Sequence, residues 1–196
     1  MHTLPAHRAR NRPFQAGTTL IEVLVTVVIL AFGLLGIAAF QAKAQVGTLE
    51  SYQRAQAVVL LEDLRARMAA NRNRMAEYVT AAPLGTGDAA SDCEALAGSA
   101  RDKCEWSVAL KGAAETLGGN QSGAMIGARG CVDEVQAADP TNGVCKPGIY
   151  LVTVAWQGLH PTIAPALACG SGAYGLETNR RAISARVSVG VAECKI

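Results

Sequence analysis

Six cysteines, the histidine His160 outside the N-terminal segment and one acid within an apolar run are the residues of this sequence that could carry chemistry. The cysteines all lie in the second half of the chain: Cys93, Cys104, Cys131, Cys145, Cys169 and Cys194. None forms a C-x-x-C pair, and a zinc site normally has tighter ligand spacing. An even number of cysteines downstream of an apolar segment favours disulfides formed in an oxidising compartment. We therefore expect disulfides, no metal site and no cofactor.

The pairing of the cysteines is open, because six of them allow fifteen arrangements. We expect nearest neighbours to pair, as Cys93–Cys104, Cys131–Cys145 and Cys169–Cys194. The second pair would close a loop around a Pro140–Gly143 turn. Closing a loop of this size is worth about 3 kcal/mol on chain-entropy grounds.

Catalysis is not indicated by any motif. His160 lies between glycine and proline in GLHPT, as a loop residue would, and a triad needs a base beside a nucleophile. The sequence has no G-x-S-x-G, H-E-x-x-H or Walker motif. Trp106, Tyr150 and Trp156 are predicted to belong to the core rather than to a ligand platform. We expect no enzyme activity.

The acid, Glu22, lies near the start of an apolar run from Leu20 to Phe40. At about 1.5 Å per residue, this run spans the roughly 30 Å hydrocarbon layer of a membrane. A secretory signal peptide has a shorter apolar core followed by a small-x-small cleavage site, so we expect the run to be retained. Three arginines upstream and few charges downstream predict a cytoplasmic N-terminus, with the rest of the chain periplasmic or extracellular.

An acid in this position requires an explanation. It costs about 2.5–3.5 kcal/mol at mid-membrane, and less near the interface, and such residues usually have a partner. One candidate partner is a free amino group made by cutting the chain just before Thr18. Glu22 would then be the fifth residue of the mature protein, and it could pair with the amine of a neighbouring molecule to fix the stagger of packed helices.

The short basic leader ending in Gly17, followed by the helix that starts Thr-Leu-Ile-Glu, resembles the class III signal of type IV pilins and type II secretion pseudopilins. The stretch LIEVLVTVVILAFGLLGIAAFQAKAQ resembles minor pilins of the PilV kind more closely than major pilins, and VTVAWQG is also similar to them. The resemblance implies cleavage after Gly17 by prepilin peptidase, N-methylation of Thr18 and a role for Glu22 in assembly. It also implies partners, namely other minor and major pilins and the pilus assembly platform in the inner membrane.

Two features depart from the family pattern. Thr18 stands where the family usually has Phe or Met, which weakens the expectation of methylation more than that of cleavage. The proline common in the apolar helix of major pilins is absent, while Gly33 and Gly36 fall nearby. These glycines either let the helix stretch inside a filament or allow close helix packing through small residues.

Beyond the apolar run, the sequence predicts that the helix continues to about residue 81, giving about 60 helical residues or roughly 90 Å. Its apolar stripe is predicted at Leu49, Tyr52, Gln56, Leu60, Leu64, Met68, Asn71, Met75 and Val79. Five arginines make the segment basic, either as a surface for DNA or anionic lipid or as a solvated face with local ion pairs, which we favour. Subtracting the three leader arginines from 18 basic residues leaves 15 against 16 acids, so nucleic acid is not an expected partner.

The rest of the chain is predicted to be a head of loops and antiparallel strands. Two stretches alternate clearly, with Tyr150 to Trp156 and Ile183 to Val191 each presenting one apolar face. EWSVAL is predicted as a further strand, and a short helix is expected around residues 93–100. Residues 82–147 otherwise look loop-like, 158–181 form a long excursion, and Asn120–Ser122 matches an N-glycosylation pattern that short sequences often match by chance.

The predicted fold class is therefore α+β, a pilin-like lollipop with a long N-terminal helix packed on a small antiparallel sheet with disulfide-tied loops. Its parts are a cleaved leader (1–17), the membrane or filament-core half of the helix (18–45), the amphipathic half (46–81) and the head (82–196). The predicted function is that of a minor pilin precursor in type IV pilus assembly. The alternatives are a type II secretion pseudopilin, a single-pass anchor with a binding or adhesive domain, and a membrane-tethered enzyme.

Overall fold

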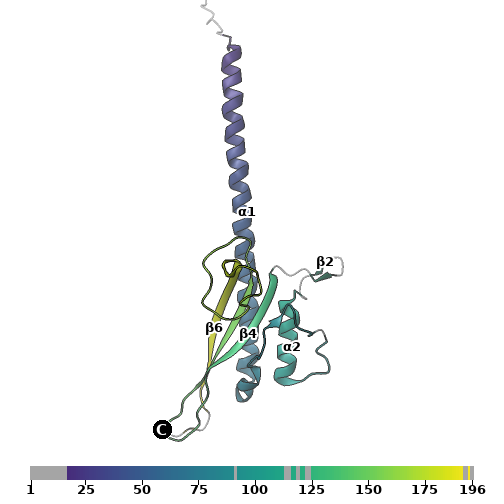
Figure 1. Ribbon diagram of the computed structural model, residues 1–196, viewed down its shortest axis with the longest axis vertical. Helices are drawn as coiled ribbons and strands as arrows, with labels where there is room; N and C mark the ends of the chain where they lie inside the picture. Colours follow the sequence, from purple (N-terminus) through teal and green to yellow (C-terminus); the bar gives the residue numbers. More distant parts are fainter. Residues whose placement is uncertain are drawn as a thin grey trace, which may run out of the picture. The chain divides into compact units, whose positions relative to one another are not determined.

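The computed structural model describes residues 17–90, 92–112, 116–117, 120–121, 125–191 and 194. The predicted leader lies outside these residues except for Gly17, and the Asn120–Ser122 pattern lies only partly within them. The chain divides into two compact units between Gln45 and Val46. The first helix, α1 (Leu20–Ala70), begins in one unit and ends in the other (Figure 1).

The described part of the first unit is helical from Leu20 onward and presents its apolar side chains to the surroundings. The most apolar 18-residue window of α1 has a mean hydropathy of 2.8, and none of it is buried. By length and composition, α1 can cross a membrane. Aliphatic side chains exposed in this way need a nonaqueous environment or neighbouring helices.

In the second unit, α1 buries one stripe of side chains, namely Gln53, Ala57, Leu61, Leu64 and Met68. The predicted stripe is wrong in its first half by about one residue, because Leu49 and Tyr52 are 55% and 48% exposed. Gln53, Ala57 and Leu61 are spaced by steps of four, and Ala57 and Leu61 belong to the core cluster that also contains residues of β4 and β5.

The α-helix ends at Ala70, earlier than predicted, and a 3-10 helix, η1, follows over Arg72–Tyr78. Asn71 leaves the helical region with φ −111° and ψ 45°, and its side-chain amide donates to the Arg67 carbonyl at 3.3 Å. Asparagine commonly ends helices by competing for main-chain hydrogen bonds in this way. The 3-10 helix η1 places Met75 and Tyr78 in the core.

The head contains a four-stranded antiparallel sheet in the order β1-β4-β5-β6. Two of its strands, β4 and β6, are labelled in Figure 1. Its strands are β1 (Leu84–Gly85), β4 (Ile126–Gln136), β5 (Gly148–Gln157) and β6 (Arg180–Val189). The two predicted strands are confirmed, and Tyr150, Val152, Val154 and Trp156 face the core that α1 covers. A separate two-stranded sheet joins β2 (Thr116–Leu117) to β3 (Asn120–Gln121).

Strand β4 was not predicted, and the strand predicted at EWSVAL is wrong. That sequence belongs to a second helix, α2 (Gly98–Leu110), which also begins later than the predicted short helix. Trp106 and Leu110, four residues apart, lie on the buried face of α2. Trp106 is fully buried, and its indole N–H donates to the Leu60 carbonyl at 2.8 Å, which fastens α2 to α1.

All six cysteines form disulfides, as Cys93–Cys104, Cys131–Cys169 and Cys145–Cys194. The expected pairs Cys131–Cys145 and Cys169–Cys194 are wrong. Cys131 lies within β4, where it faces away from α1 beside Ala155 and Tyr174. Its partner there is Cys169 of the excursion (residues 158–179), and this leaves Cys145 to pair with Cys194 near the C-terminus.

The second half of α1 and helix α2 cover one face of the sheet, and the three disulfides tie the loops around it. The predicted α+β class, a long N-terminal helix with a small antiparallel sheet and disulfide-tied loops, is confirmed.

Candidate functional site: the start of α1 and the polar junctions of the head

The start of α1 is organised by Thr19 and Glu22. The main-chain N–H groups of Glu22 and Val23 donate to the Thr19 carbonyl at 3.1 and 3.3 Å, and the Glu22 N–H also lies 3.4 Å from the Thr19 hydroxyl. Thr19 therefore caps the helix, and Thr-x-x-Glu is the pattern of a capping box. An acid in the first turn also interacts favourably with the helix dipole. Sequence reasoning missed the cap made by Thr19, although the Thr-x-x-Glu spacing signals a helix start; the Glu22 side chain makes no reciprocal hydrogen bond to Thr19.

The residues around the predicted cleavage point are open. Gly17, Thr18 and Glu22 are exposed, and a Cβ atom added at Gly17 would meet nothing within 4 Å. Within the described residues, no ion pair or side-chain hydrogen bond engages the Glu22 carboxylate. The peptide bond after Gly17 is thus accessible, and the acid is available to a partner from outside the chain.

Gly33 and Gly36 lie within unbroken helix, and a Cβ atom at either would also meet nothing within 4 Å. The helix of the single chain is therefore not stretched at these glycines. The surface beside them is free for a neighbouring helix to approach.

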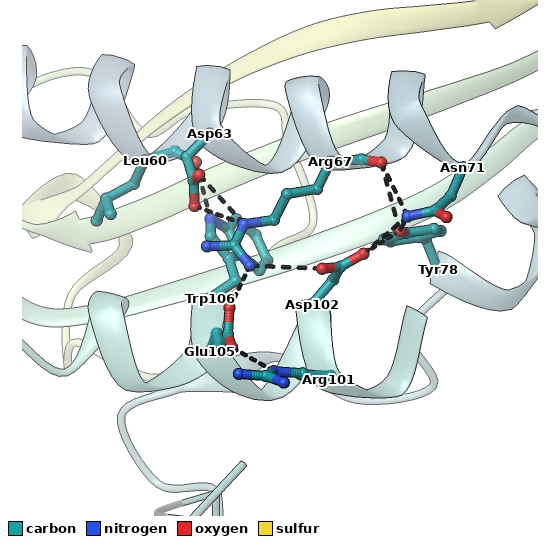
Figure 2. A network of polar contacts seen from close by, with 9 residues as sticks. All are labelled: Leu60, Asp63, Arg67, Asn71, Tyr78, Arg101, Asp102, Glu105 and Trp106. Carbon is teal, nitrogen blue, oxygen red and sulfur yellow. Dashed lines mark hydrogen bonds and ion pairs between the residues drawn. The ribbon is translucent and has the colours of Figure 1, made fainter. Parts of the chain in front are cut away.

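In the head, Arg67 connects α1 to α2 (Figure 2). Its guanidinium donates to Glu105 at 2.5 Å, to Asp63 at 3.1 Å and more weakly to Asp102 at 3.4 Å. Partial burial alone would lower the pKa of Arg67, but the hydrogen bonds to Glu105 and Asp63 outweigh burial and raise it. Arg101 donates to the same Glu105 carboxylate at 2.7 Å. The cluster is a multi-residue ion-pair junction between two helices.

Tyr78 and Asn71 extend this junction to η1. The Tyr78 hydroxyl donates to the Asp102 carboxylate, and the Asn71 amide donates to the Tyr78 oxygen at 2.8 Å and to Asp102 at 3.1 Å (Figure 2). Burial, followed by the hydrogen bond to Asp102, raises the pKa of Tyr78 to about 12. These groups hold one another in place, and the arrangement pairs no nucleophile with a base.

The excursion is held by Arg180, whose side chain is almost fully buried. Its guanidinium donates to the carbonyls of Pro165 (3.2 Å), Cys169 (3.0 Å) and Leu167, and forms an ion pair with Glu177. On the same side of the sheet, the Tyr174 hydroxyl donates to main-chain carbonyls of β4 and β5. Sequence reasoning missed Arg180, because an arginine at the start of a strand gives no signal that it will be buried.

His160 lies beside Glu50 rather than beside a nucleophile. One Glu50 oxygen lies 3.3 Å from His160 Nδ1 and 3.1 Å from an Arg181 nitrogen, and accepts from the Leu159 N–H at 3.2 Å. This contact ties the excursion to α1. Across the part of the chain that the structure describes, no group of three His, Cys, Asp or Glu side chains is arranged to hold a metal ion.

The basic residues of α1 and η1 are mostly paired locally. Arg65, Arg67 and Arg74 form ion pairs with acids three or four residues away. This matches the interpretation of a solvated helix face with local ion pairs better than that of a DNA-binding surface.

Comparison with known protein families gives a match at the N-terminus. Residues 12–38 match the family described as Prokaryotic N-terminal methylation motif, and this segment contains Gly17, Thr18 and Glu22. No curated protein and no solved structure matches the chain significantly. The chain therefore carries the prokaryotic N-terminal methylation motif, the class III signal of a type IV pilin-like or pseudopilin precursor.

Proposed function

We propose that this protein is a minor pilin, similar to PilV, that is processed by prepilin peptidase and enters a type IV pilus or its initiating complex. The observation that carries the proposal is Glu22, which is exposed and whose carboxylate pairs with none of the described residues, at the start of an exposed apolar helix within the methylation motif. The peptidase cuts after Gly17, and the amine of Thr18 becomes the new N-terminus, which is then methylated.

In this proposal Glu22 has a partner only after assembly. The carboxylate of one subunit pairs with the Thr18 amine of the next, which removes the cost of leaving an acid unpaired in an apolar layer. Before assembly, the protein is a single-pass inner-membrane protein with its leader in the cytoplasm and its head in the periplasm. Its partners are prepilin peptidase, other minor and major pilins, and the assembly platform. Its role is structural, and it uses no catalysis, cofactor, metal or nucleic acid.

A type II secretion pseudopilin is the second candidate, because the methylation motif is shared by both systems. A single-pass anchor with a binding or adhesive domain is the third, and it would retain residues 1–17. The intact mass of the protein from membranes with and without prepilin peptidase separates the third candidate from the others. We expect loss of residues 1–17 only when the peptidase is present. A full leader in both strains would overturn the proposal.

Substitutions at Glu22 separate the need for its charge from the need for a polar side chain of its size. Glu22→Gln keeps the size and polarity of the side chain but removes the charge, whereas Glu22→Ala removes both. We expect both variants to insert into the membrane and neither to enter filaments, since the amine of a neighbour needs a carboxylate. The measurement is the amount of each variant in membranes and in sheared pili. Wild-type amounts of Glu22→Gln in pili would contradict a role for the carboxylate charge in assembly.

A further inference from the structure

Strand β6 forms one edge of the sheet and, among the described strands, pairs only with β5. Just beyond their last pair, Gln157↔Arg180, the Gly158 N–H donates to the Asn179 carbonyl at 2.8 Å. Hydrogen-bonded pairs alternate along an antiparallel ladder, so the odd-numbered residues of β6 direct their main-chain groups to β5. Ala182, Ser184 and Arg186 therefore direct their N–H and C=O groups outward.

This edge has few of the usual protections against strand pairing. Natural edge strands are protected by short length, bulges, proline, charged side chains (especially lysine) or a covering segment. β6 has no proline or lysine, and its register with β5 runs without a shift from Gly148↔Val189 to Gln157↔Arg180. Its arginines Arg180 and Arg181 are paired within the head, which leaves Arg186 as the exposed charge on the strand. Among the residues that the structure describes, no hydrogen bond from another segment reaches the outward groups of Ala182, Ser184 or Arg186.

The edge lies along a groove between α1 and the excursion. Two adjoining hollows, of about 270 and 460 Å³, share Arg54, Ala182 and Ile183. In the larger hollow, Val58 of α1 lies on one wall, and Leu167 of the excursion also lines it. Val58 is 45% exposed, so the groove offers apolar surface beside open main-chain groups.

The groove contains acidic and basic side chains, and its acids are already paired. Glu50 is paired with Arg181, and Glu62 with Arg65. Arg54 is exposed, and within the described residues no carboxylate forms an ion pair with it. The charge left without a partner in the groove is therefore positive, which favours a carboxylate on whatever occupies it.

We propose that the outer edge of β6 binds a short extended segment of a partner protein, which adds a strand to the sheet beside Ala182, Ser184 and Arg186. Main-chain hydrogen bonds provide affinity, as in other cases of strand addition, and the groove provides selectivity. The segment places an apolar side chain against Val58 and a carboxylate beside Arg54. This inference concerns the head alone and holds for a pilus or a secretion subunit.

The test uses the full chain in detergent and a fluorescein-labelled eight-residue peptide of alternating valine and threonine with one central glutamate. Ser184→Pro removes only an outward N–H, at a position where an edge strand tolerates proline, and Ser184→Ala is the matched control that keeps it. We expect the wild type and Ser184→Ala to bind equally by fluorescence anisotropy, and Ser184→Pro to bind about tenfold more weakly. Arg54→Glu should weaken binding about fivefold and favour a peptide with lysine in place of glutamate.

Hydrogen exchange shows whether the variant is folded and where the peptide lies. The peptide should slow exchange at the outward amides of Ser184 and Arg186 and leave those of Ile183 and Ala185 unchanged. The Ile183 amide should remain slow in Ser184→Pro, which shows that the β5–β6 ladder persists. Equal binding by Ser184→Pro with an intact ladder, or no saturable binding to the wild type at millimolar peptide, would overturn the proposal. Self-association of the wild type that Ser184→Pro abolishes would also overturn it, in favour of a second copy as the occupant.

Discussion

At the scale of single residues, polar side chains of the head form hydrogen bonds and ion pairs that connect different elements. Tyr78 of η1 is fully buried, and its hydroxyl donates to Asp102 of α2. A phenol in this position resists ionisation, because the phenolate would be desolvated and would face a carboxylate. The raised pKa of Tyr78, about 12, follows from this placement and connects the stability of the head to pH.

We predict that the head loses stability as pH rises above 10. The ordinary pKa of tyrosine, about 10, applies in the unfolded chain, which therefore releases its proton before the folded protein does. The difference of about 2 between the two pKa values corresponds to about 3 kcal/mol, which is fully present below pH 10 and is lost as pH rises toward 12. Urea unfolding followed by tryptophan fluorescence between pH 9 and about 11 measures this slope.

Tyr78→Phe provides the control for this prediction. Tyr150 and Tyr174 also have raised pKa values, mainly through burial, so part of the pH dependence is present in both proteins. We expect a shallower decline of the unfolding free energy in Tyr78→Phe than in the wild type. Identical slopes would mean that Tyr78 ionises in the folded head as easily as in the unfolded chain.

Arg180 is a second residue whose role depends on burial. Arg180→Met would leave the carbonyls of Pro165, Leu167 and Cys169, and the Glu177 carboxylate, without this donor. Unpaired buried acceptors cost about 1–3 kcal/mol each, so we expect the excursion to open locally. Limited chymotrypsin digestion, followed by reduction and mass spectrometry, should show cleavage after Leu167 or Tyr174 at least about tenfold faster than in the wild type.

The matched control for Arg180 is the exposed Arg186 on the same strand. Arg186→Met removes the same charge and should leave the digestion rate unchanged. Equal acceleration in the two variants would point to net charge rather than to the buried contacts of Arg180.

At the scale of elements, the packing of α2 on β4 depends on one glycine. A Cβ atom at Gly130 would lie 2.1 and 2.4 Å from two atoms of the Trp106 ring, which no rotamer change of a fully buried ring can relieve cheaply. We predict that Gly130→Ala lowers the unfolding free energy of the head by about 3 kcal/mol. Gly190→Ala, where a Cβ would meet nothing within 4 Å, should change it by less than about 0.5 kcal/mol. Urea unfolding of both variants tests the contrast, and a Gly130→Ala protein as stable as the wild type would contradict it.

The regularity of each strand explains whether its sequence predicted it. β5 and β6 alternate regularly because each has one face on the core, so their sequences predict them. β4 carries Gly127 and Gly130, and its register with β5 shifts between Ile126 and Arg129 and again between Glu134 and Gln136. These irregularities hide its period of two.

The apolar residues of EWSVAL fit both a strand and a helix. Trp106 and Leu110 are two alternate steps apart in a strand, but they are also one helical turn apart. The helix fits the fold because Gly130 of β4, which is distant in sequence, leaves room for the Trp106 ring. The start of α1 could be recognised from the sequence because its pattern, a leader ending in Gly17 followed by Thr-Leu-Ile-Glu, is local. The cysteine pairing could not be predicted, because it depends on which distant segments the sheet brings together.

At the scale of the whole molecule, the disulfides divide into one pair inside the head and two pairs nearer its surface. Cys131 and Cys169 are 7% and 5% exposed and pack with Ala155 and Tyr174. Cys145 and Cys194 are only half-buried. The two longer-range pairs span 38 and 49 residues, so each contributes about 4 kcal/mol on chain-entropy grounds, and their difference lies in packing and access rather than in loop length.

We predict that a non-reduced digest of the full chain yields the three pairs of the structure, and that graded reduction opens Cys145–Cys194 before Cys131–Cys169. Exchange requires a thiolate to reach a sulfur atom, so the buried pair should survive until the head unfolds. Trapping with an alkylating reagent and mass spectrometry gives the order. Double replacement with alanine should likewise cost more stability at Cys131 and Cys169 than at Cys145 and Cys194, because only the former also removes buried contacts. Recovery of Cys131–Cys145 from the native protein would contradict the position of β4, since Cys131 could not then face the excursion.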